Sequence, residues 1–372
     1  MRLGLVSLPM AGKSTLMAAA AAWARLATRQ GEGGAPRAGA GAAPSAPASG
    51  VVVARIPDER VDWLAEQYRP RKVTHATIEW VEVPALAPAH LQALHRLDAV
   101  ALVVRAFDPE QRSVPHPEGR VDPVADFRRL WEEWLLLDWS QVQGRIERLR
   151  SAQSVPKAQR RDIERELSVL ERCLQVLEQG LPLSKAALDP EEAALLKGYS
   201  LVTFRPVLLA VNLDDAQLAA GGDYPGRDEL QKAAMGRVEA VVDVAARLEL
   251  ELAELDAESR EAFAQELHLT LPVGVERLGR AAYDACGFIA FLTAGEDEVR
   301  AWTITRGTVA RDAAGKVHSD IARGFIRAEV VAFDDLKEAG SLARARERGL
   351  LRLEGKDYVV KDGDVIEFRF NV

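Results

Sequence analysis

The stretch that decides the fold is "LGLVSLPMAGKSTLM", Leu3–Met17. Its apolar start is typical of a buried strand and its end is typical of a helix, with a Gly-Lys-Ser-Thr loop between them. This order of strand, loop and helix predicts a phosphate-binding P-loop, in which backbone N–H groups and the helix N-terminus surround a phosphate. The expected loop residues are Met10, Ala11, Gly12, Lys13, Ser14 and Thr15.

Single residues of this loop have separate expected roles. Gly12 lets the main chain approach the phosphates, Lys13 reaches the β- and γ-phosphates, and the Ser14 hydroxyl ligates Mg²⁺. Ser7 stands where the motif wants glycine, and a non-glycine residue in a tight or positive-φ turn costs about 1 kcal/mol. The loop therefore predicts a site for ATP or GTP with Mg²⁺, weakened at Ser7.

Composition limits the class of protein. The chain has 372 residues with a net charge of -8, so its surface as a whole is not built for nucleic acid. Two distant cysteines, Cys173 and Cys286, indicate neither a disulfide framework nor a zinc site. Charged residues interrupt the apolar runs before they reach membrane-spanning length, and the start is not typical of a signal peptide. We expect a cytoplasmic soluble protein without a membrane partner.

Three apolar runs after the P-loop predict strands buried on both faces: "LDAVALVVRAF" (97–107), "RPVLLAVNL" (205–213) and "EAVVDVAA" (239–246). Because helical segments alternate with them, we expect a doubly wound α/β sheet. This nucleotide-binding domain is expected to comprise residues 1–124 and 198–285. Its Gly/Ala/Pro/Ser tract at 31–50 is typical of a mobile loop.

Residues 125–197 are expected to form an inserted antiparallel helical hairpin, because apolar residues recur at heptad-like spacing from Ile163 to Leu177. Its tip carries six basic residues against the single acid Glu147: Arg145, Arg148, Arg150, Lys157, Arg160 and Arg161. Two interpretations stay open for this tip. It is either a solvated helix end or a surface that contacts the phosphates of an RNA backbone. After residue 286, short alternating strands separated by Gly and Asp predict a small, mostly β domain, 286–372.

Several segments in chain order resemble the YchF / Obg-like ATPase family. They are "SLPMAGKST", "ELSVLERCLQVLEQG", "VTFRPVLLAVNLDD" and, above all, "FLTAGEDEVRAWTI", "GKVHSDIARGFIRAEVV" and "LEGKDYVVKDGDVIEFRFNV". The resemblance implies a GTPase-type domain, a coiled-coil insertion and a C-terminal TGS domain of ubiquitin-like β-grasp shape. It also implies binding and slow hydrolysis of ATP, and association with the ribosome.

The chain departs from this family where the γ-phosphate should be sensed. The family's D-x-x-G motif reads "EVPA" here, with Glu82 for the Asp and Pro84-Ala85 in the turn, and proline donates no N–H. No threonine occurs between Thr28 and Thr74 to serve as the switch residue. The family resemblance implies a catalytic histidine before "VDP", and His116 is at that position. We expect weak or absent hydrolysis.

The segment "VNLDD" is expected to contact the base through Asn212, Leu213 and Asp215. Leu213 resembles the family, which prefers adenine, whereas Asp215 resembles the guanine reader of GTPases, so ATP and GTP both remain open. Two other functions compete with a YchF-like nucleotide-binding protein. One is a pseudo-NTPase adaptor that binds ribosome or RNA through the hairpin tip and the TGS domain. The other is a metabolic P-loop kinase, against which the TGS-like C-terminal segment argues.

Overall fold

The computed structural model describes residues 1–31, 50–107, 120–151, 157–196, 198–199, 201–266 and 273–371. The chain forms two compact units. Of the described residues, the first contains Met1–Trp23, 50–52 and Glu79–Ala282, and the second contains 24–31, Val53–Ile78 and 283–371. The boundaries expected at residues 124/125, 197/198 and 285/286 stay predictions. Among the described residues, none of the helices combines the length and the apolar character needed to cross a membrane.

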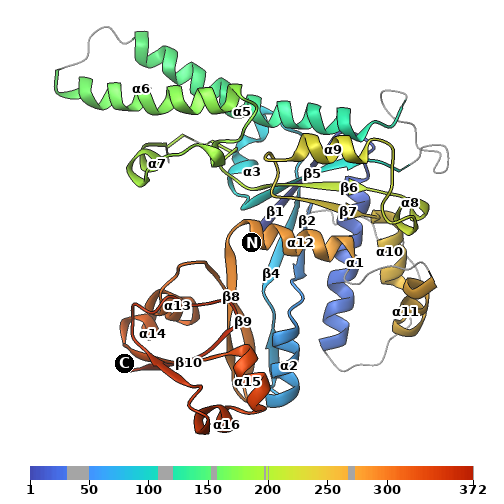
Figure 1. Cartoon of the computed structure of the whole chain (residues 1–372), viewed down its shortest axis with the longest axis vertical. Coiled ribbons are helices and arrows are strands. Elements are labelled where there is room, and N and C mark those ends of the chain that lie inside the picture. The colour runs from blue at the N-terminus through green and yellow to red at the C-terminus, as the bar shows by residue number, and fades with distance from the viewer. Residues whose placement is uncertain are drawn as a thin grey trace. The chain divides into compact units, whose positions relative to one another are not determined.

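The first unit is built on a sheet whose strand order is β2-β4-β1-β5-β6-β7. Strand β1 pairs in parallel with β4 and β5, β5 pairs with β6, and β6 pairs with β7. The expected doubly wound α/β fold is confirmed, with α5 and α9 on one side of the sheet and α1 and α12 on the other (Figure 1). The strands are β1 Arg2–Ser7, β2 Val51–Arg55, β4 Thr77–Glu82, β5 Ala99–Arg105, β6 Val207–Asn212 and β7 Ala240–Val244.

The helices of this unit cover a continuous apolar core. Strands β5 and β6 are buried along their whole length, as their uninterrupted apolar sequences predict. The helices are α1 Lys13–Gly31, η1 Pro88–His90, α3 Leu91–His95, α5 Pro123–Ser151, α6 Lys157–Glu178, η2 Leu183–Lys185, α7 Pro190–Leu196, α8 Asp215–Ala219, α9 Arg227–Ala234, α10 Ala246–Glu254, α11 Ala257–Glu266 and α12 Gly274–Ala285.

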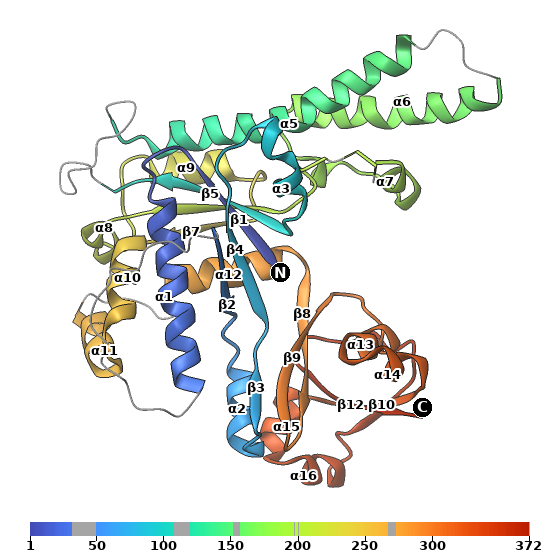
Figure 2. The same ribbon diagram turned by 180° about the vertical axis from the view of Figure 1, so that it is seen from behind.

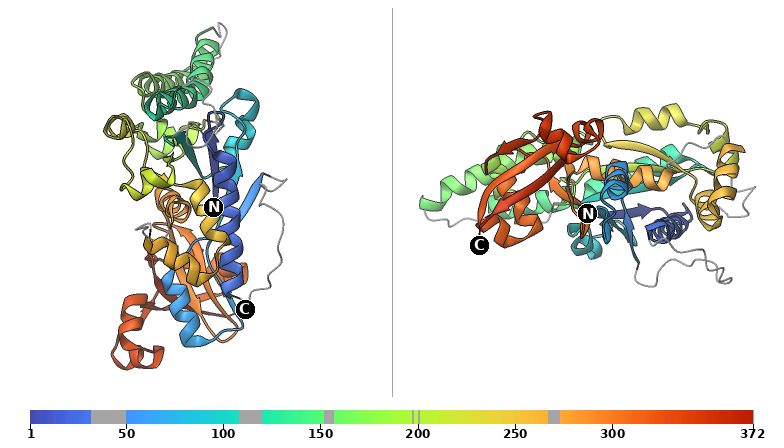
Figure 3. Two further views of the ribbon diagram at one scale, coloured as in Figure 1. Left: turned by 90° about the vertical axis from the view of Figure 1, so that its right-hand side faces the viewer. Right: turned by 90° about the horizontal axis from the view of Figure 1, so that it is seen from below.

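Helices α5 and α6 pack side by side as the expected hairpin (Figure 3). The apolar seam predicted from the sequence is buried between them, with Val142 and Ile146 from α5 and Leu170 and Leu177 from α6. Asp138, a fully buried carboxylate of α5, accepts hydrogen bonds from the backbone N–H groups of Val202 (2.8 Å) and Thr203 (2.7 Å). This contact fixes the hairpin to the segment that leads into β6.

The second unit is a β-grasp sheet with strand order β11-β10-β12-β8-β9-β3. Strand β12 pairs in parallel with β8, and helix α13 packs on β9 and β10. Strand β3, which precedes β4 in sequence, adds to the edge of this sheet beside β9 (Figure 2). Sequence reasoning missed this strand. The elements are α2 Glu59–Tyr68, β3 Lys72–Thr74, β8 Phe288–Ala294, β9 Glu298–Thr305, α13 Ala310–Val317, α14 Ser319–Arg323, β10 Phe325–Ala332, α15 Phe333–Ala339, α16 Leu342–Glu347, β11 Arg352–Glu354 and β12 Asp364–Phe370.

Candidate functional site

The loop between β1 and α1 has the backbone that a P-loop requires. Gly12 has a φ of +88°, and a Cβ atom added there would lie 2.2 Å from Nδ2 of Asn212. Both observations exclude any other residue at this position without rearrangement. Lys13, Ser14 and Thr15 form the first turn of α1, so their N–H groups point into the loop without intrahelical partners.

The strain expected at Ser7 is absent, and that expectation was wrong. Ser7 is the last residue of β1 and pairs with Val103. Met10 and Arg69 are the non-glycine residues with positive φ among those described, with Met10 at +67°. The left-handed turn therefore lies at Met10, whose side chain is half-exposed, and this conformation costs a non-glycine residue about 1–2 kcal/mol.

The "EVPA" segment contacts the two side chains that should hold a nucleotide. Lys13 Nζ donates a 2.6 Å hydrogen bond to the Val83 carbonyl and lies 3.7 Å from Oε1 of Glu82. The Ser14 hydroxyl donates to the same Glu82 oxygen at 3.2 Å. Burial lowers the pKa of Lys13 below its usual value of 10.5, while the charge of Glu82 opposes this shift. Lys13 is thus a desolvated ammonium group, stabilised by the segment that replaces the γ-phosphate sensor.

Asn212 connects the P-loop to the carboxyl ends of β6 and β7. Its Nδ2 donates to the Ala11 carbonyl at 3.0 Å, and its Oδ1 accepts from the backbone N–H of Ala246 at 3.1 Å. Leu213, expected beside the base, has a side chain that is buried among the core residues, and its contact with a nucleobase stays a prediction. Asp215 is partly exposed at the start of α8, whose N-cap is Asp214.

A cavity of about 610 Å³ is lined by the P-loop and by Pro84, Ala85 and Leu86. Phe107 lines it at the end of β5, and Arg129, Leu130 and Glu133 line it from α5. Sequence reasoning missed the α5 residues. The available signal was the i, i+4 pair of Arg129 and Glu133 on the helix that follows "VDP".

The residues at the start of α1 fit a magnesium ion. Mg²⁺ is bound in proteins by one or two oxygen side chains plus substrate phosphates. The Ser14 hydroxyl and the Glu82 carboxylate are oxygen groups of this kind, and they lie 3.2 Å apart. Among the residues that the structure describes, no cluster of three or more His, Cys, Asp or Glu side chains could hold a metal by itself, so such an ion would depend on the phosphates for its remaining ligands.

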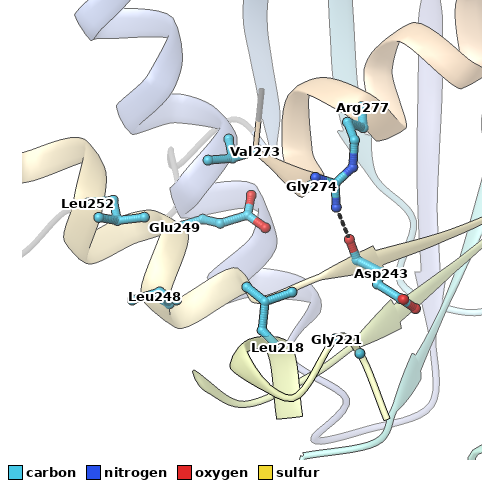
Figure 4. Close-up of a pocket in the computed structure, with 10 residues that line it drawn as sticks. Leu218, Gly221, Asp243, Leu248, Glu249, Leu252, Val273, Gly274 and Arg277 are labelled. Carbon is cyan, nitrogen blue, oxygen red and sulfur yellow. Dashed lines mark hydrogen bonds between the residues drawn. The ribbon is translucent and has the colours of Figure 1, made fainter. Parts of the chain in front are cut away.

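A second pocket of about 410 Å³ contains no P-loop residue and is lined by Asp243, Glu249 and Arg277 (Figure 4). Its polar groups have partners within the protein. Glu249 accepts from the backbone N–H groups of Ala245 (2.9 Å) and Val275 (2.8 Å), and Arg277 donates to the Asp243 carbonyl at 3.0 Å. These contacts tie α12 to β7 and α10, so the pocket's polar residues serve the fold.

The six basic residues of the hairpin tip do not form one free patch. Arg145 pairs with Glu166 of α6 at 2.8 Å, and Arg150 pairs with Glu171 of α6 at 2.7 Å. The expectation that Glu147 is the single acidic residue near these basic side chains was therefore wrong. Arg148 donates to the Gly144 carbonyl of its own helix. Arg160 and Arg161 are exposed, whereas the Lys157 side chain lies outside the described part. His116 also lies outside the described residues.

The fold and the loop together define a P-loop protein of the GTPase type with a β-grasp unit. A family model named YchF-GTPase_C, described as a protein of unknown function (DUF933), matches residues 288–371. "Ribosome-binding ATPase YchF" of Bacillus subtilis is 34% identical, and that of Escherichia coli O157:H7 is 36% identical, each with 99% of both chains covered. The YchF GTPase structure of Schizosaccharomyces pombe superposes with a TM-score of 0.84 at 26% identity, covering 99% of this chain and 97% of that one. The chain belongs to the YchF family.

Proposed function

We propose that this chain binds ATP or GTP with Mg²⁺ at its P-loop, hydrolyses it weakly or not at all, and associates with the ribosome in the cytoplasm. The observation that supports the nucleotide site is the loop itself, with Gly12 in a positive-φ turn and Lys13 and Ser14 opening α1. The bacterial relatives are named ribosome-binding ATPases, which favours ATP and supplies the expected partner.

In this proposal the loop amides hold the β-phosphate, Lys13 neutralises the terminal phosphates, and Ser14 with Glu82 holds Mg²⁺. When bound, the metal supplies charge neutralisation at the phosphates. Weak hydrolysis follows from "EVPA", because Pro84 has no N–H and because Ala85, which replaces the glycine of the motif, is less free to adopt the turn that directs its N–H to the γ-phosphate. His116 remains a proposed catalytic residue from the family resemblance alone.

Base preference is proposed to depend on few contacts. The buried Leu213 side chain leaves Asp215 as the proposed reader of the base edge, together with the backbone that Asn212 organises. A guanine-reading role for Asp215 would favour GTP, while the names of the bacterial relatives favour ATP. Measured affinities for both nucleotides therefore decide between them.

The test is an equilibrium titration of the full chain with fluorescent ATP, GTP, ADP and GDP, with and without Mg²⁺. Lys13→Ala should abolish or strongly weaken binding of all four nucleotides. Lys185→Ala is the matched control, since Lys185 pairs with Glu239 at 3.2 Å and lines no part of the P-loop cavity. No binding by the wild-type chain at millimolar nucleotide would overturn the proposal.

The adaptor function is kept as the second candidate because Arg160 and Arg161 are exposed near the hairpin tip. Co-sedimentation with ribosomes at low salt, with and without nucleotide, separates the two functions. Charge reversal by Arg160→Glu with Arg161→Glu should release the protein from the ribosomal pellet if the tip contacts RNA. Arg247→Glu is the control, because Arg247 is equally basic and exposed but pairs with Glu251 on α10.

A further inference from the structure

The segment between β4 and β5, residues 83–97, contains η1 and α3. Its start is bound to the P-loop, because Lys13 Nζ donates a 2.6 Å hydrogen bond to the Val83 carbonyl. In the proposed nucleotide complex Lys13 reaches the β- and γ-phosphates, so the ligand competes with Val83 for the same ammonium group. The way in which the start of this segment is held therefore depends on whether a nucleotide is bound.

The end of the same segment is held by Arg205, which lies just before β6. Its Nε donates to the Leu97 carbonyl at 2.8 Å, and its Nη2 donates to the His95 carbonyl at 2.7 Å. His95 is the last residue of α3, where helix carbonyls need partners outside the helix. Because β4 and β6 run in the same direction, the segment starts at the carboxyl end of β4 and meets Arg205 at the amino end of β6. It thus joins two opposite edges of the sheet.

Arg205 belongs to residues 201–205, which the helical hairpin also holds. Its Nη1 donates to the Leu201 carbonyl at 3.1 Å. The Asp138 carboxylate of α5 accepts from the N–H groups of Val202 and Thr203. Burial lowers the pKa of Arg205, and the charge of Asp138 opposes this shift, so the hairpin carboxylate also attracts the guanidinium. The hairpin and the end of α3 are therefore bound to the same short segment.

This junction is not closely packed. A cavity of about 630 Å³ is lined by Leu97, Arg205 and Tyr199 together with their neighbours. The Tyr199 hydroxyl accepts a 2.8 Å hydrogen bond from Nε of Arg145 and donates to Glu166, so side chains from both hairpin helices contact one wall of the cavity. A closely packed interior resists displacement, whereas this cavity leaves room for the side chains at the junction to shift.

We propose that Arg205 is a positioning residue that couples the P-loop to the helical hairpin. When Lys13 leaves the Val83 carbonyl, residues 83–97 lose one of their two anchors, and Arg205 transmits this change to Val202 and Thr203, where α5 is fixed. The inference rests on the proposed nucleotide-binding function for its ligand and deepens it, because it names a regulation of that site. The coupling is reciprocal, so a partner that moves the hairpin also changes nucleotide affinity.

The experiment measures amide hydrogen exchange at Val202 and Thr203 in the full chain without nucleotide. Lys13→Met removes the bond to Val83 and should speed exchange at both amides about threefold or more, because the hydrogen bonds to the hairpin open more often. In an Arg205→Met background, Lys13→Met should change the exchange rates less than about 1.5-fold, since the connection is already broken. A non-hydrolysable ATP analogue with Mg²⁺ should reproduce the effect of Lys13→Met in the wild-type chain and not in Arg205→Met.

Arg237→Met is the matched control. Arg237 is half-buried just before β7, as Arg205 is before β6, and it donates at 2.6 Å to the carbonyl of Ala233 in the preceding helix α9. This variant should keep the full response to Lys13→Met. Where Arg205→Met does not fold, Arg205→Lys takes its place and should reduce the response by about half or more, because an ammonium group lacks the fixed fork of donors.

The inference is overturned if Lys13→Met leaves exchange at Val202 and Thr203 unchanged, or if the response is as large with Arg205→Met as without it. A merely structural role of Arg205 gives this second result, because Arg205→Met would then speed exchange without removing the response. An analogue that binds but does not change exchange also overturns the inference. If the analogue does not bind at all, the proposed function fails, whereas the response to Lys13→Met still decides whether the coupling exists.

Discussion

The Asn212 side chain donates a 3.0 Å hydrogen bond to the carbonyl oxygen of Ala11, which joins two residues 201 positions apart in the chain. The other end of the same amide accepts from the backbone of Ala246. Asn212 is 4% exposed, so neither partner can turn to water if the side chain is removed. The shape of the P-loop is therefore fixed by the carboxyl end of β6.

Replacement of Asn212 by Ala should lower the free energy of unfolding by about 2–3 kcal/mol, because a buried carbonyl and a buried N–H lose their partners. It should also weaken di- and triphosphate binding to a similar extent, since the loop itself loosens. Urea unfolding and nucleotide titration measure the two effects. Met235→Ala, at a 77% exposed site, should stay within about 0.5 kcal/mol of wild type. A fully stable Asn212→Ala variant would contradict this account.

Glu82→Gln should change the metal dependence of binding. Glu82 contacts Ser14 at 3.2 Å and lies 3.7 Å from Lys13, so its carboxylate competes with phosphate and also supplies a Mg²⁺ ligand. Without Mg²⁺ the variant should bind nucleotide up to about fivefold more tightly, because that factor corresponds to the free energy that one partly exposed ion pair contributes. With Mg²⁺ this advantage should disappear, because the metal loses a carboxylate.

Titrations in EDTA and in Mg²⁺ measure this difference directly. Glu79→Gln is the matched control, since Glu79 is on the same strand but pairs with Arg2 at 3.0 Å. If Glu82→Gln binds nucleotide more weakly than wild type in EDTA, the carboxylate assists the phosphate site and does not compete with it.

As the pH rises into the alkaline range, deprotonation of Lys13 should lower nucleotide affinity but raise the free energy of unfolding. Burial lowers the pKa of Lys13 in the folded protein below 10.5. Nucleotide affinity should fall as pH rises through that lowered pKa, because the ammonium charge is lost. Between it and 10.5 the unfolded chain binds more protons than the folded one, so the free energy of unfolding should rise with pH.

Nucleotide titration and urea unfolding over an alkaline pH series measure both trends. Lys13→Met should remove the contribution of this group from each profile. Glu82→Gln should move the fall in affinity to lower pH, because the charge of Glu82 raises the pKa of Lys13. A wild-type affinity that stays constant up to 10.5 would show that Lys13 does not act through its charge.

The P-loop and the parallel sheet could be predicted because their signals are local. The Gly-Lys-Ser-Thr segment lies between an apolar run and a helix, and the runs at 97–107 and 205–213 became β5 and β6. The strain assigned to Ser7 came from a motif position, whereas the left-handed residue is Met10. A sequence motif predicts that a tight loop is present, but it does not predict which residue of the loop adopts a positive φ.

Features that depend on packing could not be read from the sequence. Arg145 meets Glu166 because two helices pack in one register, and their separation of 21 positions in the chain gives no indication of it. Leu213 follows an apolar strand, and this sequence pattern would be the same if its side chain faced a base or the core, so the pattern does not predict that Leu213 is buried. The pairing of β3 with β9 in the second sheet is likewise a contact between distant segments, and the cavity that is lined by both the P-loop and α5 also brings distant segments together.

Asp138 provides the strongest test of how the hairpin is fixed to the sheet. Its carboxylate accepts from the N–H groups of Val202 and Thr203 and from the Thr203 hydroxyl, all within 2.8 Å, and the residue is fully buried. Asp138→Ala leaves these donors unsatisfied and should lower the free energy of unfolding by about 3–5 kcal/mol. Asp138→Asn should also lower the free energy of unfolding, because the NH₂ group of the amide would face a backbone N–H, and both groups are hydrogen-bond donors.

Urea unfolding followed by circular dichroism measures these losses. Leu136→Ala is the control on the same helix, since Leu136 is 56% exposed and should cost no more than about 0.5 kcal/mol. If Asp138→Ala leaves the free energy of unfolding unchanged, the segment at Val202 and Thr203 is held by other contacts. In that case the hairpin base is not fixed through Asp138 to the segment that leads into the strand ending at Asn212.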